Sequence, residues 1–554
     1  MLDQFCRSDF ADYADFYRNF EVTCPARFNF AYDVLDEMAA HTPDDLALLW
    51  CNDLGEERCV TFAEIKTMSD KYAQTLADLG IRKGDAVMVM LKRRYEYWFL
   101  VMAAHKIGAI LIPATHMLTA KDVVYRVQSA NVKMILAAPD DKLCANIAHA
   151  KEQCGDILQV TAVLSGARAG FADFTALVAA QTKDWQRPAG NDYPCADDLM
   201  LAYFTSGTTG MPKIVAHDYQ YPLGHITTAK FWHGLQPGDL HLTVADTGWA
   251  KAVWGKLYGQ WLCGATVFVY DYETRFQPTD FLELIDKYGI TSFCAPPTIY
   301  RFFIKADLSK YSLKSLKKCT IAGEPLNPEV YQQWLQATGL KLKEGFGQTE
   351  GPIMAATTIY DEPRLGSMGK SLPGIFCDVY NERDHLCEAG EIGELCIPMP
   401  GGRRPLGLFA GYYNDETRYQ SVVYNGLYHT GDIAWRDEDG YIWFSGRNDD
   451  IIKSSGYRIG PFEVESALLE HPAVMESAVT GVPDPVRGFS VKATIILAKD
   501  YAPSEELKKE LQDHVKRTTA PYKYPRIIEF VDELPKTISG KIRRVEIRQD
   551  DAAK

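Results

Sequence analysis

One stretch combines hydroxyl groups, glycines and a cation at spacings that suit phosphate binding. It reads Thr-Ser-Gly-Thr-Thr-Gly-Met-Pro-Lys from residue 205 to residue 213. Glycines let backbone amides approach an anion closely, while hydroxyl groups and Lys213 add donors and positive charge. A Walker A loop is excluded, because Pro212 intervenes and Ile214 follows the lysine. The stretch therefore indicates a nucleotide loop of another kind, or else a Ser/Thr/Gly surface linker. The residues expected to hold phosphate oxygens are Thr205, Ser206, Gly207, Thr208, Thr209, Gly210 and Lys213.

Two later segments offer the groups that adenine and a divalent cation need. The turn Gly-Glu-Pro at residues 323–325 is suited to lie under an adenine ring. In residues 344–350 an aromatic ring between glycines is suited to stacking on a base, and Thr349 and Glu350 add the oxygen ligands that Mg²⁺ prefers. Each segment alone is equally compatible with an ordinary turn. The residues expected to contact ATP here are Gly323, Glu324, Pro325, Glu344, Gly345, Phe346, Gly347, Gln348 and Thr349.

Three segments nearer the C-terminus complete this set of groups. In Tyr-His-Thr-Gly-Asp432 the carboxylate is suited to accept both ribose hydroxyls. Arg447 and Arg458 offer guanidinium groups for ribose and phosphate. Lys541 follows a Ser-Gly turn in a basic segment near the end of the chain, for which a disordered basic tail is the alternative interpretation.

Size, charge and cysteine spacing limit the classes of function. The 554 residues suffice for two to four structural units. The net charge of −14 argues against a nucleic-acid or anionic-membrane surface, so an anionic ligand needs a local basic site. The 13 cysteines are never spaced C-x-x-C, which predicts reduced, mostly buried thiols and no metal cluster. Acidic residues at the start and a longest apolar stretch broken by His105 and Lys106 predict a cytoplasmic protein without a membrane span.

Apolar runs of strand length alternate with helical patterns from residue 46 to about residue 365. This alternation predicts an α/β fold with mostly parallel sheets. We expect a large N-terminal domain of two stacked βα sheet subdomains plus a small β-barrel, followed by a small mobile α+β domain. The predicted boundaries are 1–198 for the first subdomain, 199–365 for the second, 366–448 for the β-barrel and 449–554 for the C-terminal domain.

In this order and combination the motifs resemble those of the AMP-forming acyl-CoA synthetases. These enzymes belong to the larger adenylate-forming family, with aryl-CoA ligases, firefly luciferase and nonribosomal peptide synthetase adenylation domains. The resemblance covers nearly the whole chain. The segments Gly248-Trp-Ala-Lys, Pro483-Asp-Pro-Val-Arg-Gly and the run 519–526 look most like the medium-chain branch and its archaeal and bacterial relatives.

The resemblance implies a two-step reaction with Mg²⁺, ATP and coenzyme A. A carboxylate attacks the α-phosphorus of ATP, which gives acyl-AMP and pyrophosphate, and the CoA thiol then displaces AMP. The resemblance implies that Lys541 bridges the carboxylate and the α-phosphate, where negative charge develops. It assigns Glu350 to magnesium, Asp432 and Arg447 to ribose, and Arg458 to a phosphate. The residues expected to be catalytic are Lys541, Glu350 and Thr205.

In this family the C-terminal domain swings between the two half-reactions about a hinge acid, which here is Asp449. One face brings in Lys541, and the other brings a CoA-binding surface. Arg487 and Lys516 of that surface are also compatible with a solvated basic face. The residues expected to bind CoA are Ser455, Gly456, Tyr457, Arg487 and Lys516.

The acyl substrate is the least determined part. Acetate-specific members carry a tryptophan directly before the Gln-Thr-Glu run, where this chain has Gly347, so we expect an acid longer than acetate. Trp249 and Trp254 are expected to form another wall that favours short, branched or medium-chain acids, although Trp254 equally suits a plain core position. An aryl acid such as benzoate remains open.

Two other functions stay under consideration. An enzyme that passes the acyl group to a carrier protein or another non-CoA acceptor would share the first step. A binding protein that holds ATP without turnover is disfavoured, because Lys541, Glu350 and Asp432 occur together. The expected partners are small molecules, and the sequence leaves the oligomeric state open, a homodimer included.

Overall fold

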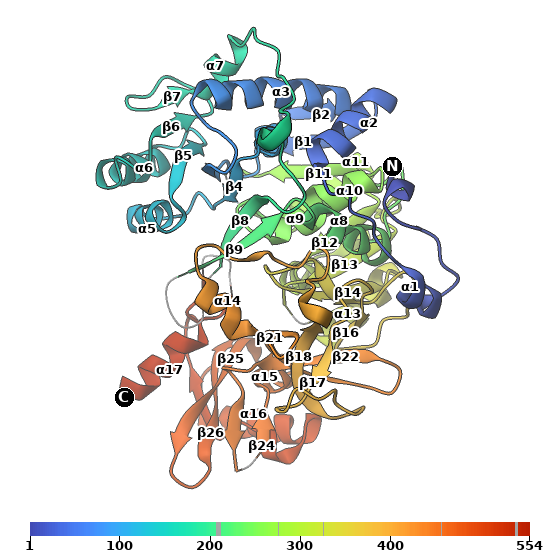
Figure 1. Cartoon of the computed structure of the whole chain (residues 1–554). Helices are drawn as coiled ribbons and strands as arrows, with labels where there is room; N and C mark the ends of the chain where they lie inside the picture. Colours follow the sequence, from blue (N-terminus) through green and yellow to red (C-terminus); the bar gives the residue numbers. More distant parts are fainter. Residues whose placement is uncertain (206–211, 275, 325, 456, 538–540, 554) are drawn as a thin grey trace.

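The computed structural model describes residues 1–205, 212–274, 276–324, 326–455, 457–537 and 541–553, and for Arg458 and Ala553 the backbone alone. Three β-sheets organise these residues (Figure 1). Sheets of eight and fourteen strands form the large N-terminal body. A five-stranded sheet lies at the opposite end of the molecule from α3 (Phe62–Asp78) and α7 (Phe174–Ala179) (Figure 1). The predicted α/β fold class is confirmed.

The eight-stranded sheet is parallel at its centre. Its middle strand is buried along its whole length, as expected for an uninterrupted apolar run covered on both faces. In spatial order its strands are β19 (Gly411–Tyr412), β9 (Lys213–Asp218), β8 (Leu199–Thr205), β4 (Ile110–Pro113), β3 (Ala86–Met90), β5 (Val132–Ala137), β6 (Val160–Val163) and β7 (Ala172–Asp173).

The fourteen-stranded sheet changes from parallel to antiparallel pairing after β14. β20 (Val423–Tyr424) pairs with β21 beside the main order. In spatial order its other strands are β17 (Asp378–Tyr380), β18 (Ile392–Pro398), β21 (Leu427–Arg436), β22 (Tyr441–Arg447), β16 (Ser367–Ser371), β15 (Ile353–Ala356), β14 (Leu342–Gly347), β13 (Lys318–Ala322), β12 (Ser292–Ala295), β10 (Leu240–Thr243), β11 (Thr266–Asp271), β1 (Leu46–Asn52) and β2 (Glu57–Thr61).

The C-terminal sheet is built on a long antiparallel pair, and its last strand joins in parallel. Its strands are β24 (Tyr457–Ile459), β23 (Ile452–Ser454), β26 (Gly488–Leu497), β25 (Val474–Asp484) and β27 (Ile527–Phe530). Helix α15 (Pro461–Leu469) packs on β25 and on α16 (Glu505–Thr518), and α17 (Arg544–Ala553) also packs on β25.

Helices cover the sheets of the N-terminal body. α3 begins after Thr61, whose side chain accepts a hydrogen bond from the Glu64 amide at 3.2 Å and so caps the helix. The other long helices are α4 (Glu96–Ile107), α5 (Ala120–Ala130), α6 (Asp141–Gln153), α11 (Asp280–Tyr288), α12 (Pro297–Lys305) and α13 (Pro328–Thr338). No helix among the described residues is long and apolar enough to cross a membrane.

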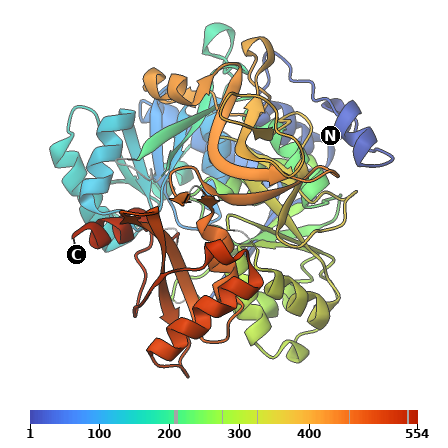
Figure 2. The same cartoon turned by 90° about the horizontal axis from the view of Figure 1, so that it is seen from below.

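The sheets do not divide at the residues predicted from the sequence. β8 and β9 lie within the predicted second subdomain, yet they join the first sheet through β4. β1 lies within the predicted first subdomain, yet it pairs in parallel with β11 of the second sheet. The strands predicted as a small β-barrel continue the second sheet as a curled antiparallel layer (Figure 2, yellow to orange). An apolar run indicates that a strand is buried but not which strand it pairs with.

Candidate active site

The predicted phosphate loop connects the two strands of an antiparallel hairpin. Thr205 ends β8 and pairs with Lys213, which begins β9. The Thr205 Oγ1 atom is buried and has no hydrogen-bond partner among the described residues. The hairpin thus brings a hydroxyl group and an ammonium group to the two ends of the loop. The predicted phosphate contacts Ser206, Gly207, Thr208, Thr209 and Gly210 lie outside the described residues.

Lys213 meets Glu350 in a compact group of three side chains. The Lys213 Nζ atom lies 2.5 Å from Glu350 Oε1 and 2.8 Å from the Tyr412 hydroxyl. That hydroxyl also donates to Glu350 Oε1 at 3.0 Å. Burial alone would raise the pKa of Glu350, but the charge and hydrogen bond of Lys213 outweigh it and hold the pKa below its usual value. Glu350 is therefore a carboxylate that a cation already neutralises.

A second polar group surrounds Asp432 on β21. Gln348 donates to Asp432 Oδ2 at 2.5 Å, and Arg447 lies 3.2 Å from Asp432 Oδ1. Both donors also reach the carbonyl of Thr430, at 2.9 and 3.0 Å. Tyr428 fixes the amide by donating to Gln348 Oε1 at 2.7 Å. Burial raises the pKa of Asp432, and Arg447 and Gln348 oppose that rise. The structure thus brings the predicted residues Gln348, Asp432 and Arg447 together.

The end of β13 carries the predicted adenine turn. Gly323 follows this strand with a φ of +97°, a conformation that favours glycine. A Cβ atom on Gly323 would lie 3.4 Å from Lys251 Nζ, and that ammonium donates to the Ala322 carbonyl at 2.6 Å. Glu324 accepts from the Thr298 hydroxyl at 2.7 Å. Pro325 lies outside the described residues.

β14 places two glycines against two indole rings. A Cβ atom on Gly345 would lie 2.6 Å from the ring of Trp232, and one on Gly347 would lie 3.1 Å from the ring of Trp254. These approaches are too close for a side chain, so only glycine fits without movement. Trp249 is half-buried beside the start of α9 (Lys251–Lys256).

Three further predicted ATP contacts lie on β14 or directly after it. Phe346 lies 6.4 Å from the ring of Phe444, in a stacked arrangement. The Thr349 carbonyl accepts from His217 at 2.8 Å. Glu344 is buried, which raises the pKa of its carboxyl to about 8. A group with that pKa is protonated at neutral pH.

The C-terminal domain directs Lys541 toward the N-terminal body. The positive charge of Lys541 opposes the rise that burial causes in the pKa of Asp432, and it adds to burial in lowering the pKa of Lys251. The Lys541 ammonium therefore lies within electrostatic reach of both residues. The predicted hinge acid Asp449 lies 3.6 Å from Arg447.

The predicted CoA-binding residues lie on the C-terminal sheet and beside it. The Ser455 amide donates to the Arg487 carbonyl at 2.9 Å, which places these two residues together. Tyr457 is half-exposed and stacks on Tyr522 at 4.0 Å. Lys516 lies on α16 and is paired with Asp513, so it is not a free cation. Gly456 lies outside the described residues, as does the side chain of Arg458.

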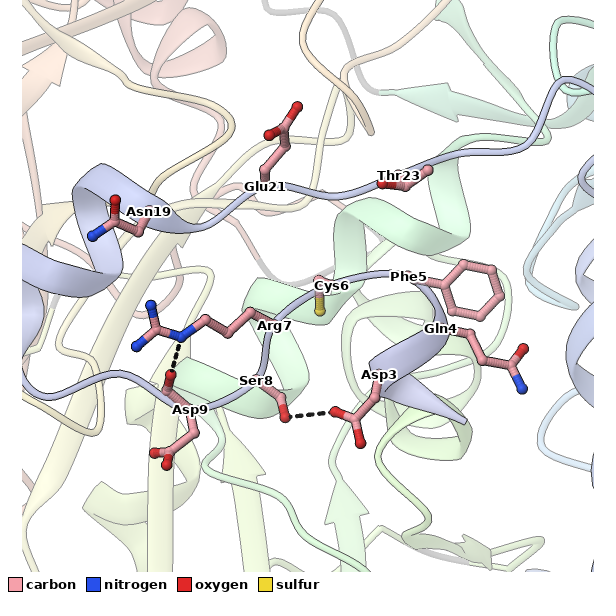
Figure 3. A pocket seen from close by; sticks show the side chains of 10 residues that line it. All are labelled: Asp3, Gln4, Phe5, Cys6, Arg7, Ser8, Asp9, Asn19, Glu21 and Thr23. Atoms are coloured by element: carbon pink, nitrogen blue, oxygen red, sulfur yellow. Dashed lines mark hydrogen bonds between the residues drawn. The ribbon is translucent and has the colours of Figure 1, made fainter.

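A separate surface hollow of about 690 Å³ lies at the N-terminal segment (Figure 3). Within it Arg7 donates to the backbone carbonyl of Asp9, and the Ser8 hydroxyl donates to the Asp3 carboxylate. None of the predicted site residues lines it. Its lining residues are Asp3, Gln4, Phe5, Cys6, Arg7, Ser8, Asp9, Asn19, Glu21 and Thr23.

Sequence reasoning did not assign a role to three residues that the structure places in these groups. Tyr412 binds both Lys213 and Glu350, although it lies far from either in the chain. Lys251 and Trp232 contact the positions of the adenine turn and of β14. Among these three residues, only Lys251 could have been noticed from the sequence, because a lysine is unusual at the start of an apolar helix.

The fold and the site together define an adenylate-forming enzyme. Residues 35–413 match the family described as AMP-binding enzyme, and residues 463–541 match its C-terminal domain. The chain belongs to this family. It is 41% identical to acyl-coenzyme A synthetase ACSM3, mitochondrial, of Mus musculus, over 98% of this chain and 94% of that protein.

Two solved structures show the same architecture. The anthranilate CoA ligase AuaEII in complex with anthranoyl-AMP matches with a TM-score of 0.85 and 28% identity, over 96% of this chain and 99% of that one. The acyl-CoA synthetase of Brucella canis matches with a TM-score of 0.70 and 33% identity, over 95% and 94%. The predicted enzyme class is confirmed: an AMP-forming acid–thiol ligase that uses ATP, Mg²⁺ and CoA.

Proposed function

We propose that this enzyme activates a short, branched or medium-chain carboxylic acid, with Lys541, Glu350 and Thr205 as the catalytic residues. The observation that carries the assignment is the buried carboxylate of Asp432, which Gln348 and Arg447 hold at 2.5 and 3.2 Å and on which the positive charge of Lys541 also acts. This orientation suits the first half-reaction, because the cation faces the groups proposed for ATP.

Charge placement explains how these residues would promote adenylation. Negative charge develops on the α-phosphate when the carboxylate attacks it, and a fixed cation stabilises that charge. Lys541 supplies this cation from the C-terminal domain. Asp432, held by Gln348 and Arg447, accepts the ribose hydroxyls and so fixes the α-phosphate relative to the acid. Lys213 contacts the outgoing phosphates at the end of the hairpin.

The residues present fit a magnesium ion. Lys213 and Tyr412 occupy only the Oε1 atom of Glu350, and no other described residue bonds to its Oε2 atom. Carboxylate, hydroxyl and phosphate oxygens form the hard ligand set that Mg²⁺ takes. We propose that Glu350 holds the ion. The buried Thr205 hydroxyl lies opposite Lys213 in the hairpin, and Lys213 is the ion-pair partner of Glu350. The bound ion would supply charge neutralisation for the phosphates.

The thioester step would use the opposite face of the C-terminal domain. Asp449 is proposed as the hinge, and the surface with Ser455, Tyr457 and Arg487 as the CoA site. The proposal includes Gly456 and Lys516. The exposed ring pair of Tyr457 and Tyr522 offers a flat apolar surface to the pantetheine or base of CoA. A domain boundary near residue 449 belongs to this proposal.

Two tryptophans support the proposed class of acid. Trp232 and Trp254 lie against Gly345 and Gly347 of β14, and their indoles would bound an apolar acyl site of limited length. An aryl acid is the second candidate, because the similar structure AuaEII is named an anthranilate CoA ligase. A non-CoA acceptor, a homodimer and a cytoplasmic location stay predictions, and ACSM3 is named a mitochondrial enzyme.

A panel of carboxylic acids tests this proposal in both half-reactions. Pyrophosphate release is measured with ATP, Mg²⁺ and each acid, and thioester formation is measured after addition of CoA. We expect release to depend on the acid, with acids of medium length or with a branch preferred over acetate and over long fatty acids. Preference for benzoate-type acids would favour the second candidate. Release without thioester formation would contradict CoA as the acceptor.

A further inference from the structure

A cysteine, a histidine and a glutamate meet at the pairing of β18 with β21, on the strand that also bears Asp432. Cys396 and His429 are direct partners in the antiparallel register, and Glu394 lies two residues before Cys396 on the same face of β18. The Cys396 Sγ atom lies 3.5 Å from His429 Nδ1, and Glu394 Oε2 lies 3.2 Å from the same nitrogen. All three ligand atoms lie within 4.8 Å of one another.

A hydrogen bond at Nδ1 pairs His429 fully with only one of its two neighbours. The His429 Nδ1 atom either carries a proton and donates, or has a lone pair and accepts. If it donates to Glu394, the Cys396 thiol finds no acceptor there. If it accepts from Cys396, the Glu394 carboxylate faces a lone pair. A cation bound by all three atoms removes this conflict, because each atom then donates an electron pair.

Two of the three distances between the ligand atoms fit the edges of a zinc coordination tetrahedron. With Zn–S near 2.3 Å and Zn–N and Zn–O near 2.0–2.1 Å, a tetrahedral angle gives an S···N edge of about 3.6 Å and an N···O edge of about 3.4 Å. The observed edges are 3.5 Å and 3.2 Å. A thiolate with an imidazole selects Zn²⁺ over Mg²⁺, and three protein ligands leave one position for water.

The surroundings place a carboxylate near the second nitrogen of His429, although beyond hydrogen-bond distance. His429 Nε2 is buried without a hydrogen-bond partner among the described residues, and its nearest carboxylate is that of Asp384 at 3.9 Å. Such a carboxylate commonly orients a ligating histidine through its second nitrogen. Asn425 holds Asp384 at 2.6 Å, and Tyr424 stacks on the imidazole at 3.8 Å with an angle of 8°.

We propose that Glu394, Cys396 and His429 form a zinc site that holds the segment bearing Asp432. The register between β18 and β21 shifts here, so that residues 430–432 lie opposite Leu395 alone. The remaining oxygen of Glu394, Oε1, accepts from the Gly431 amide at 2.8 Å within this bulge. A zinc ion would therefore fix, through Glu394 and His429, the backbone on both sides of Thr430. This role is separate from the magnesium proposed at Glu350.

Cobalt titration tests the site directly. The reduced, EDTA-treated full chain is titrated with Co²⁺ alone, and the charge-transfer band of a cobalt–thiolate bond is recorded. We expect one equivalent to bind the wild type and the Cys377→Ala variant with this band, and Cys396→Ala to lack it. Cys377 is the matched control, since it is a buried cysteine of the same antiparallel layer whose thiol contacts the Met354 carbonyl. A wild type without the band, or a band retained in Cys396→Ala, would overturn the proposal.

Three further measurements keep the test decisive if Cys396→Ala fails to fold. X-ray absorption of the zinc-loaded wild type should show one sulfur and otherwise nitrogen or oxygen neighbours, and several sulfurs would refute the site. The Asp384→Asn variant should lower the zinc affinity by about 10- to 100-fold, as loss of an outer contact does. Zinc should also slow hydrogen exchange in residues 428–434 of the wild type, and unchanged exchange would contradict the proposed role.

Discussion

Replacement of Arg544 by methionine should locally destabilise the C-terminal domain around Glu465 and Val479. The Arg544 Nη2 atom contacts both carboxylate oxygens of Glu465 at 2.7 Å, and the same guanidinium lies 3.6 Å from Asp450. Glu465 also accepts from the Val479 amide at 2.7 Å, and its side chain is only 8% exposed. The substitution leaves this carboxylate buried with one neutral donor.

The expected magnitude follows from breaking one partner of a buried ion pair, which costs about 3–5 kcal/mol. A loss of that size corresponds to roughly two to four orders of magnitude in hydrogen-exchange protection, at about 1.4 kcal/mol per factor of ten. Exchange measured by mass spectrometry on the full chain should therefore accelerate by this amount around Glu465 and Val479. Adenylation should fall as well, because α17 begins at Arg544, directly after the segment that carries Lys541.

Two variants make this reasoning refutable. The double variant Arg544→Met with Glu465→Leu should recover most of the protection, because apolar side chains of similar volume often replace a buried ion pair without loss. Arg548→Met should cost less, because Arg548 contacts Asp450 alone and is 29% exposed. If Arg544→Met lowers the free energy of local unfolding by less than about 1 kcal/mol, the ion pair behaves as an exposed surface pair. That result, or a double variant no better than the single one, would refute the argument.

Three other predictions concern activity and pH. Lys541→Ala should lower the adenylation rate by about 10²–10³-fold, as the loss of one charge-stabilising group does. The variant should still form thioester from supplied acyl-AMP. An equal loss in both half-reactions would contradict the domain swing. Gly347→Ala should lower kcat/KM by about 10–200-fold, most for the longest acids. The reason is that its Cβ would lie 2.7 Å from the Pro352 carbonyl and 3.1 Å from Trp254. An unchanged dependence on acid chain length would contradict the role of Gly347 and Trp254 as a wall of the acyl site. The raised pKa of Glu344, about 8, stabilises the folded state fully below pH 4.5, and this contribution is lost as pH rises through 8. The unfolding free energy should fall by up to about 1.4 kcal/mol per pH unit across that window, and Glu344→Gln should remove this slope; a slope unchanged in the variant would place the titration elsewhere.

Local motifs predicted the chemistry well because their groups are contiguous in sequence. The Gln348 to Glu350 run follows β14 and the segment ending at Asp432 lies within β21, and each brings a donor or a carboxylate. The family pattern supplied their order. The structure adds the partners that come from distant segments. Tyr412 reaches Glu350 only because β19 pairs with β9, and no local pattern encodes that pairing.

The division into sheets and the proposed site at Cys396 also depend on strand pairing that the sequence pattern does not contain. Apolar runs predicted buried strands, but whether β8 joins one sheet or the other depends on contacts with β4 that the run does not contain. Cysteine spacing predicted no metal cluster, since Cys396 has no cysteine two or three residues away. Its ligand partner His429 becomes a neighbour only through the register of β18 and β21. Long-range pairing therefore separates what the sequence predicted from what it could not.

The guanidinium of Arg447 gives the nucleotide site and the hinge a common member. It contacts Asp432 at 3.2 Å and Asp449 at 3.6 Å, so one cation is shared between a carboxylate proposed for ribose and the residue proposed to rotate. A ligand that weakens or strengthens the ion pair between Asp432 and Arg447 therefore also changes the attraction between Arg447 and Asp449. Thermodynamic linkage then works in both directions, because the factor by which nucleotide shifts the domain equilibrium equals the ratio of the nucleotide affinities of the two domain orientations. A hinge substitution such as Asp449→Asn that shifts this equilibrium therefore also changes the apparent nucleotide affinity.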